Sequence, residues 1–451
     1  MASMAEQMAS NFNFGALSKA TELKKRLWFT LGALIIYRIG TYLPLPGIDP
    51  IILEDIFDQQ RGGVLDIFDT FAGGALSRMT IFALNIMPYI SASIIMQLMT
   101  SVVPSLETLK KDGEAGRKKI NQYTRYGTVL LATVQGYGIA VGLETMQTSL
   151  GGMAVIDPGF MFRFTTVIGL VGGTMFLLWL GEQITQRGVG NGVSLIIFAG
   201  IVAGLPTALA TTLELGRQGR MSTFIILGLF LLAVAVIAVI VFFERAQRRL
   251  MVQYPKRQVG NKMYGGENSH LPLKINTAGV IPPIFASALL LMPLTLANFS
   301  GAGAEAENSG WLGYISSYLG HGQPLYLGLY IGLIVFFCFF YTSIVFNPKD
   351  TADNLKKNGG FIPGIRPGAN TASHLDHILT RLTVIGAAYL SVVCIIPEML
   401  IAKYSVPFYL GGTSLLIVVT VTMDTMTQIQ SHLLAHQYEG LIRKSKLKGR
   451  R

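Results

Sequence analysis

The sequence is poor in charged residues and has almost no cysteine. Only 14% of its 451 residues are Asp, Glu, Lys or Arg, and 51% are hydrophobic. Soluble domains carry roughly 25% charged residues, so this composition excludes an ordinary soluble domain and indicates a polytopic membrane protein. The two cysteines, Cys338 and Cys394, both lie in apolar segments. We therefore expect buried, inert thiols, not a disulfide or a metal site.

The side chains that pumps and enzymes use are also missing from the apolar segments. These segments hold no His, and the chain has no GxxxxGK[ST] loop, no HExxH motif and no paired metal-ligand spacing. Transporters place acids or His at mid-membrane, whereas the carboxylates here lie toward span ends. Arg38 is the one deep charge, and we expect a structural pairing with a carbonyl or an acid. The sequence predicts no enzyme activity, no catalytic residue, no metal and no cofactor.

Long apolar runs are what the chain has in abundance. A membrane-spanning helix needs about 20 predominantly apolar residues. By this criterion ten segments qualify: Leu27–Leu43, Ile81–Val102, Tyr126–Met146, Phe164–Ile184, Val193–Leu213, Ser222–Phe243, Ile275–Phe299, Leu325–Phe346, Leu382–Ile401 and Pro407–Met426.

The distribution of Lys and Arg sets the orientation of these spans. Most basic residues fall in one alternate set of loops, together with the N-terminal segment 1–26 and the tail 427–451. The positive-inside rule makes that set cytoplasmic, with both termini on the same side. The opposite side has few basic residues, among them Arg61, Arg163, Arg217, Arg220 and Lys403.

Ten spans divide into two halves of five, over 27–213 and 222–426, and an odd-numbered half repeats in inverted orientation. Membrane proteins of this kind place their site between the halves, where Gly- or Pro-interrupted segments correspond. Pro88 interrupts the second span, and Pro282 and Pro283 interrupt the seventh. An interior proline removes a backbone donor and clashes one turn back. We therefore expect these two spans to wall a passage.

Two predicted cytoplasmic loops, 244–274 and 347–380, are too long for simple turns. Loops beyond about 12–15 residues are usually functional or disordered. Glycines flank Arg366 in the second loop and predict a turned tip that presents it. Basic loops suit a polyanion such as ribosomal RNA, or an acidic protein surface. The alternative is that these charges only set the topology.

Several long stretches of the sequence resemble those of a known family. The matching stretches run in order over nearly the whole length, among them GALIIYRIGTYLPLPGID (33–49), GGALSRMTIFALNIMPYISASIIMQL (73–98), GEAGRKKINQYTRYGT (113–128), WLGEQITQRGVGNGVSLIIFAGIVAGLP (179–206), HLPLKINTAGVIPPIFAS (270–287), FFCFFYTSIVFNPKDTADNLKKNGGFIPGIRPG (336–368) and VPFYLGGTSLLIVV (406–419). They resemble the SecY/Sec61-alpha family of protein-translocation channels.

The resemblance implies an all-α membrane protein with ten transmembrane helices. Two inverted five-helix halves would enclose a central hourglass pore, with a lateral gate between the second and seventh spans. Unfolded secretory polypeptides would cross the membrane through this pore, and membrane-protein segments would leave through the gate into lipid. As a passive conduit, the channel would take its energy from a partner.

The resemblance also assigns roles to residues of this sequence. It places a hydrophobic pore ring at Ile86, Ile90, Val193, Ile197, Ile284 and Ile417. Val193 departs from the more usual isoleucine. It places a plug at 63–74, with Val64, Leu65, Ile67, Phe68 and Phe71. It places the lateral gate at Pro88, Ser91, Ser93, Gln97, Asn276, Pro282 and Pro283. Arg257, Lys262 and Arg366 would contact a motor or a ribosome, although Asn261-Lys262-Met263-Tyr264 departs from the family's paired arginines.

The implied partners are SecE as an obligate clamp, SecG, the SecA motor, the ribosome with its nascent chain, signal peptides and membrane lipid. SecDF and YidC are further partners of the same kind. The implied location is the bacterial cytoplasmic (inner) membrane.

Two other functions remain open from the residues alone. An ion-coupled secondary transporter of small solutes also fits ten spans with inverted repeats, and midplane acids would favour it. A membrane scaffold that recruits ribosomes without conducting anything is the other, and unbroken spans would favour that one.

Overall fold

The computed structural model describes residues 20–49, 52–53, 69, 71–145, 153–219, 222–254, 257–259, 262–264, 268–299, 323–404 and 412–448. The chain divides into two compact units. Unit 1 comprises Met1–Pro206, Leu296–Glu305 and Val421–Arg451, and unit 2 comprises Thr207–Thr295 and Ala306–Thr420. Each unit is described by itself.

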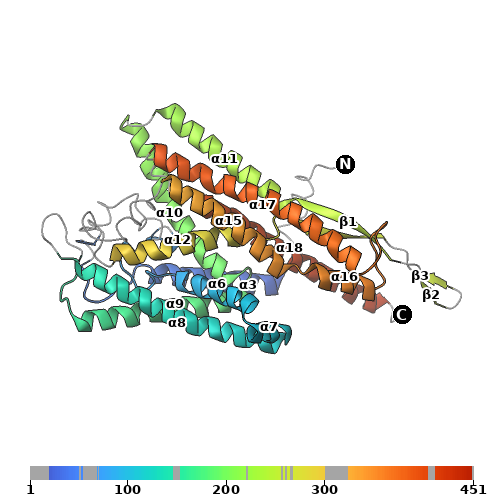
Figure 1. The fold of residues 1–451 in the computed structure, drawn as a ribbon. Helices are drawn as coiled ribbons and strands as arrows, with labels where there is room; N and C mark the ends of the chain where they lie inside the picture. Colours follow the sequence, from blue (N-terminus) through green and yellow to red (C-terminus); the bar gives the residue numbers. More distant parts are fainter. Residues whose placement is uncertain are drawn as a thin grey trace. The chain divides into compact units, whose positions relative to one another are not determined.

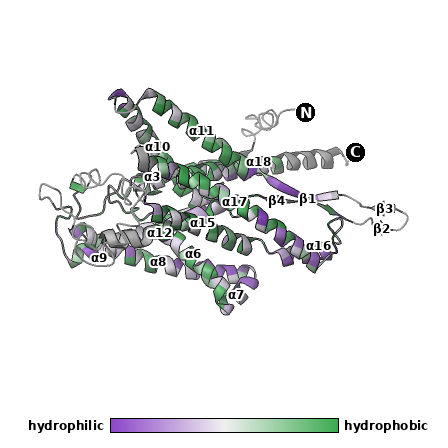
Figure 2. Ribbon diagram, turned by 45° about the horizontal axis from the view of Figure 1, so that its top comes forward, coloured by the Kyte–Doolittle hydropathy of each residue, from purple (hydrophilic) through white to green (hydrophobic). Residues whose placement is uncertain are grey.

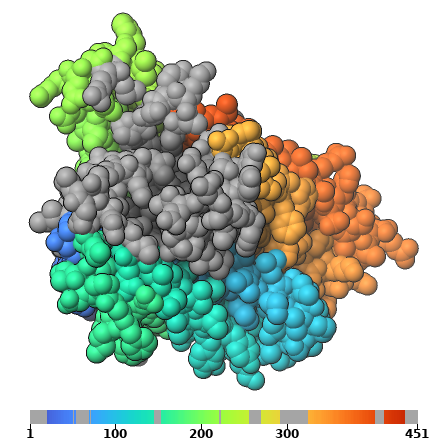
Figure 3. Space-filling model, turned by 60° about the vertical axis from the view of Figure 1, so that its left-hand side comes forward, coloured from blue at the N-terminus to red at the C-terminus, as the bar shows by residue number. Residues whose placement is uncertain are grey.

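Unit 1 is built on helices that pack side by side. They are α3 (Thr21–Gly40), α6 (Met87–Val102), α7 (Pro104–Lys111), α8 (Glu114–Thr145), α9 (Phe160–Arg187) and most of α10 (Gly192–Arg217). Helix α8 lies along α9, and α6 lies against α8, as the neighbouring light-blue and teal surfaces show (Figures 1 and 3). The axis bends by 98° between α6 and α7, because the residue before a proline is disfavoured in helical conformation.

Unit 2 holds the remaining helices. They are α11 (Thr223–Arg245), α12 (Ile281–Phe299), α15 (Pro324–Val345), α16 (Pro348–Lys357), α17 (Ala369–Tyr404) and the start of α18 (Gly412–Lys448). Helix α17 packs against α15, α16 and α11. Helix α11 has a mean hydropathy of 3.4 over its most apolar window, with only 11% of that window buried, and is green along its length (Figure 2). Such a helix suits contact with lipid.

A helix occupies part of each of the ten predicted spans, and the predicted helical membrane fold is confirmed. Among the described residues, six helices are long and apolar enough to cross a membrane, or seven if the bent pair α6 and α7 counts as one span. Several boundaries differ from those predicted. Helices α8 and α17 begin well before the predicted Tyr126 and Leu382, α6 and α12 begin later than their predicted starts, and α18 continues well beyond the predicted Met426.

The loop predicted at 244–274 contains strands that the sequence analysis did not identify. Strand β1 (Gln247–Gln253) pairs antiparallel with β4 (Asn268–Lys274), with Leu250 opposite Leu271. Strands β2 (Arg257–Val259) and β3 (Lys262–Tyr264) form a second antiparallel pair. Leu250 and Val252 are buried while the residues beside them are not, which is the two-residue alternation of a strand with one covered face.

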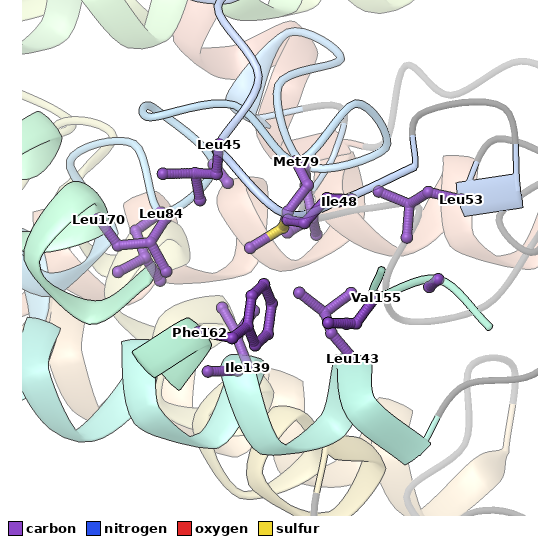
Figure 4. Close-up of a cluster of buried hydrophobic side chains, with 14 of the residues drawn as sticks. Leu45, Ile48, Leu53, Met79, Leu84, Ile139, Leu143, Val155, Phe162 and Leu170 are labelled. Carbon is purple, nitrogen blue, oxygen red and sulfur yellow. The ribbon is translucent and has the colours of Figure 1, made fainter. Parts of the chain in front are cut away.

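A buried apolar cluster holds the non-helical parts of unit 1 against its helices. Side chains from 45–53 and 76–84 meet side chains of α8, α9 and the 154–155 segment (Figure 4). Met79 is 1% exposed and lies at the centre of this contact. The cluster therefore fixes the chain that leads into α6.

Candidate functional site

In each of the two interrupted spans, the helix starts at the prolines. Pro88 lies in the first turn of α6, which starts at Met87, and residues 81–86 are turns. Pro282 and Pro283 likewise lie in the first turn of α12. The first N–H groups of a helix have no partner within the helix, so proline costs no hydrogen bond there. The expectation that Pro88 disrupts the interior of a helix is thus corrected: the interruption exists, and the proline starts the helix that follows it.

The six predicted ring residues occupy the first two turns of four helices or the residue just before. Ile86 caps α6 and Ile90 lies one turn later, with the Ile90 N–H donating to the Ile86 carbonyl at 3.1 Å. Val193 and Ile197 have the same spacing at the start of α10. Residues four apart share one face of a helix, so each pair presents two aliphatic side chains together.

The other two ring residues lie in unit 2. Ile284 is in the first turn of α12, and Ile417 is in the second turn of α18. Ile86, Ile90, Ile197 and Ile417 are buried, while Val193 and Ile284 are partly exposed. The structure places four ring residues in unit 1 and two in unit 2, and a closed ring of all six stays a prediction.

The chain just before α6 adopts an unusual backbone. Met79 and Asn85 have φ of 42° and 49°, a region that non-glycine residues rarely enter. The Met79 carbonyl accepts from the Leu45 N–H at 3.0 Å. The Asn85 amide donates to the Phe71 carbonyl at 2.6 Å, in a buried position. Tertiary contacts therefore hold a conformation that local preference alone does not favour.

The predicted plug lies mostly outside the described residues. This applies to Val64, Leu65, Ile67 and Phe68. Its last part is described: Phe71 is 5% exposed, and Gly73 and Gly74 follow with φ of 66° and 79°.

Arg38, the one deep charge, has the structural role that the sequence suggested. Its Nη1 donates to the Gly73 carbonyl at 2.8 Å, and its Nη2 donates to the Tyr42 hydroxyl at 2.9 Å. Arg78 was not singled out from sequence, yet its Nε donates to the Gly74 carbonyl at 2.8 Å. The sequence signal for Arg78 was only its place just before the predicted second span, Ile81–Val102.

The predicted gate residues are divided between the units. Pro88, Ser91, Ser93 and Gln97 lie on α6, and Gln97 has a buried Oε1 without a hydrogen-bond partner among the described residues. In unit 2 the Asn276 amide donates to Glu244 Oε1 at 2.6 Å and to the Gly279 carbonyl at 3.0 Å. Asn276 thereby fixes the turn that precedes Pro282 and Pro283. Contact between the gate residues of the second span and those of the seventh span stays a prediction.

The two long loops that were predicted to be cytoplasmic form one lobe in unit 2. Gln253 and Phe361 exchange two backbone hydrogen bonds of 2.9 and 3.0 Å, so β1 is paired with the second loop. The lobe has an apolar core of its own: Leu250, Leu273, Ile362, Leu375, Ile378, Leu379 and Leu382. The sequence analysis treated the loops separately and missed this contact.

Arg366 is exposed on this lobe, as predicted from its flanking glycines, Gly364 and Gly368, which have φ of 82° and 109°. Arg257 and Lys262 lie in β2 and β3, and their side chains lie outside the described part of the chain. Of the three, only Arg366 has a described side chain, which is exposed, and its contact with a motor or ribosome stays a prediction. Within the described residues no group of three or more His, Cys, Asp or Glu could hold a metal ion.

Two ion pairs join α8 to the α9 segment at opposite ends. Arg125 contacts both carboxylate oxygens of Glu182 at 2.6 and 2.7 Å, and Arg163 Nη2 contacts Glu144 Oε2 at 2.6 Å. Glu144 also accepts from the Gly159 N–H at 3.0 Å. These two carboxylates therefore fasten α8 to the α9 segment.

The sequence itself matches known proteins over its full length. The family model SecY matches residues 80–426. The chain belongs to the SecY family. It is 55% identical over 446 residues to "Protein translocase subunit SecY" of Vibrio cholerae, covering 99% of both chains, and the same figures hold for that protein of Escherichia coli K12. The counterpart of Rickettsia conorii is 56% identical and covers 98% of this chain and 100% of its own.

Solved structures share the SecY-family fold. "The structure of a protein conducting channel" matches with a TM-score of 0.66 at 19% identity, over 91% of this chain and 92% of that one. Sec61 in the canine ribosome–channel complex matches with a TM-score of 0.62 at 19% identity, over the same shares. These comparisons confirm the resemblance and the fold. They give no support to the solute-transporter alternative.

Proposed function

We propose that this SecY-family chain is the pore-forming subunit of a protein translocase. Unfolded secretory polypeptides pass through its pore, and membrane-protein segments leave it laterally into lipid. The observation that carries this proposal is 55% identity to named translocase subunits over 99% of both chains. The site residues agree with it, because a channel needs a hydrophobic seal and two helices that can separate, and the chain offers aliphatic ring residues and two interrupted spans.

The ring residues supply the seal in this proposal. Aliphatic side chains in the first two turns of α6, α10, α12 and α18, with Ile86 just before α6, form a hydrophobic constriction. Such a constriction excludes ions by dewetting and offers a passing chain no strong, directional contact. The plug at 63–74 closes the pore at rest, and displacement of α6 from α12 opens the gate.

The partners and the location follow from the same proposal. The chain lies in the bacterial cytoplasmic membrane. Both termini are cytoplasmic, because most basic residues lie in the two terminal segments and in the loops on the same side of the membrane. SecE clamps it, SecG accompanies it, and SecA or a translating ribosome drives it. The exposed Arg366 on the cytoplasmic lobe contacts the driver.

The deciding experiment reconstitutes the purified chain with its SecE-type partner in liposomes. With SecA, ATP and an unfolded precursor, we expect the precursor to become protected from protease. Protection should require ATP and an intact signal sequence. The absence of protection with active SecA and intact protein would refute the proposal.

The ring is tested in the same vesicles by ion conductance. Ile90 is 8% exposed, and we expect Ile90→Asn to leak ions at rest while Ile90→Leu, the matched control, stays sealed. Equal conductance in both variants would make Ile90 an ordinary packing residue.

A further inference from the structure

A polar pocket lies in unit 2 where the end of α15, α16 and the start of α17 come together. Its volume is about 840 Å³, within the range of about 300–1,000 Å³ that is typical of sites for small ligands. Helix α16 packs against α17 (Figure 1). Three alanines line the pocket, Ala352, Ala369 and Ala372, and their short side chains leave space open between the two helices.

Charged side chains of both signs line this pocket. Lys349 and Asp353 belong to α16, and Asp376 belongs to α17. All three are exposed, and none of their side chains has an ion pair or a hydrogen bond to another of the described residues. The pocket therefore offers one cation and two carboxylates to a ligand that carries both an anionic and a cationic group.

The pocket lies at the level expected for lipid headgroups. Ser343, which lines it, is within the predicted span that ends at Phe346, and Asp376 precedes the predicted start of the next span, Leu382, by six residues. Six residues of helix are about 9 Å long, and the headgroup region adds about 5–8 Å to each side of the hydrocarbon core of a bilayer. The charged groups of the pocket thus lie where the phosphate and amino groups of lipids lie.

Exposed apolar side chains continue from the pocket toward the predicted membrane. Phe339 and Phe336 lie four and seven residues before Ser343 on α15, and Val384 lies eight residues after Asp376 on α17. Residues at these spacings share one face of a helix. Because all three side chains are exposed, the acyl chains of a lipid whose headgroup is in the pocket would contact an apolar surface. A basic peptide would leave this surface uncovered, which favours a lipid as the ligand.

We propose that this pocket binds the headgroup of a phospholipid with a primary amine, phosphatidylethanolamine. Asp353 and Asp376 accept hydrogen bonds from the ammonium group, and Lys349 donates to the phosphate. Hydrogen bonds between ionised groups are roughly twice as strong as neutral ones, whereas the trimethylammonium group of phosphatidylcholine has no N–H to donate. The bound lipid holds the base of the lobe formed by the two long loops at the membrane surface. This inference goes beyond the proposed function and does not depend on what passes through the pore.

The test uses the chain with its SecE-type partner in liposomes of phosphatidylcholine and phosphatidylglycerol that contain a trace of phosphatidylethanolamine with a photoactivatable acyl chain. Irradiation should cross-link this lipid near Phe339 and Val384, as mapped by mass spectrometry. We expect Asp353→Asn and Asp376→Asn each to reduce the cross-link about tenfold, since the loss of a hydrogen bond between charged groups changes a binding constant by roughly that factor. Asp112→Asn, which removes an exposed carboxylate from another predicted cytoplasmic loop, is the matched control and should leave the cross-link unchanged.

The lysine is tested in the same way. Lys349→Gln should weaken the cross-link, whereas Lys356→Gln, which changes an exposed lysine of α16 that does not line the pocket, should not. A cross-link that survives in both aspartate variants and in Lys349→Gln would overturn the proposal.

Two competitors identify the ligand. Unlabelled phosphatidylethanolamine should displace the probe at a mole fraction about tenfold lower than added phosphatidylcholine. Soluble glycerophosphoethanolamine, which has the same headgroup and no acyl chains, should not displace it at the same concentration. Equal displacement by phosphatidylcholine, or displacement by the soluble headgroup, would overturn the assignment of this lipid. A basic segment of a partner in the pocket would leave no lipid cross-link there, and that result would also overturn it.

Discussion

Gly173 on α9 offers the sharpest test of how the pore-lining chain is positioned. A Cβ at Gly173 would overlap the backbone carbonyl of Ile81 and come within 3.3 Å of a Phe82 ring carbon. Its neighbour Gly172 is exposed and has nothing within 4 Å of such a Cβ. The pair Gly173→Ala and Gly172→Ala therefore changes the same helix by the same methyl group, with and without a clash.

The magnitudes can be estimated for each variant. Replacing glycine by alanine inside a helix gains about 0.5–1 kcal/mol, while overpacking costs about 1–3 kcal/mol. The Ile81 backbone cannot yield cheaply, because its N–H donates to the Leu43 carbonyl at 3.1 Å. Both variants gain the same stability from replacing a helical glycine by alanine, so this gain cancels in the comparison. Gly173→Ala should therefore be less stable than Gly172→Ala by roughly 1–3 kcal/mol.

The assay is equilibrium unfolding of both variants in mixed micelles, followed by resting conductance in liposomes. Ile81 lies five residues before Ile86, so a displaced carbonyl should also disturb the ring and raise the conductance of Gly173→Ala alone. Equal stability of the two variants would refute the close packing of 81–86 on α9. A stability loss with unchanged conductance would refute the link from this contact to the ring.

Two further predictions concern side chains away from the pore. Arg163→Gln should lower the stability of the fold. Adding Glu144→Gln should lower it little further, because the two substitutions remove the same ion pair. A fully additive loss in unfolding experiments would show that the pair does not act as a unit. Cys338 and Cys394 are 2% and 1% exposed, so a maleimide should label them only after denaturation, and labelling of the folded chain would show that the helices around them open.

Hydropathy predicted the helices well because the bilayer demands long apolar runs, but it could not place their ends. Helix α17 starts at Ala369, well before the predicted Leu382. Its first turns carry Leu375, Ile378 and Leu379, which pack into the lobe formed by the two long loops. Apolar residues three to four apart mark an amphipathic helix. A search for long, uniformly apolar runs does not detect this pattern.

Proline was interpreted correctly as an interruption and wrongly as an interior kink. A proline near the middle of an apolar run is compatible with either a bent helix or a new helix start. Pro88 is in the first turn because 81–86 is held away from helical geometry by contacts with Leu43 and α9. Those contacts join residues far apart in sequence, so no local pattern contains them.

The same reasoning explains the role of the deep arginine, Arg38. Non-helical backbone within a membrane protein must find hydrogen-bond partners in the protein, since lipid offers none. The carbonyls of Phe71 to Gly74 face this demand, and Arg38 supplies donors across 35 residues of sequence. A guanidinium has five N–H donors and no acceptor, which suits several carbonyls at once. The charge of Arg38 is thus accounted for by the backbone of an irregular segment, as expected from the sequence, and its removal should affect the seal before it affects transport.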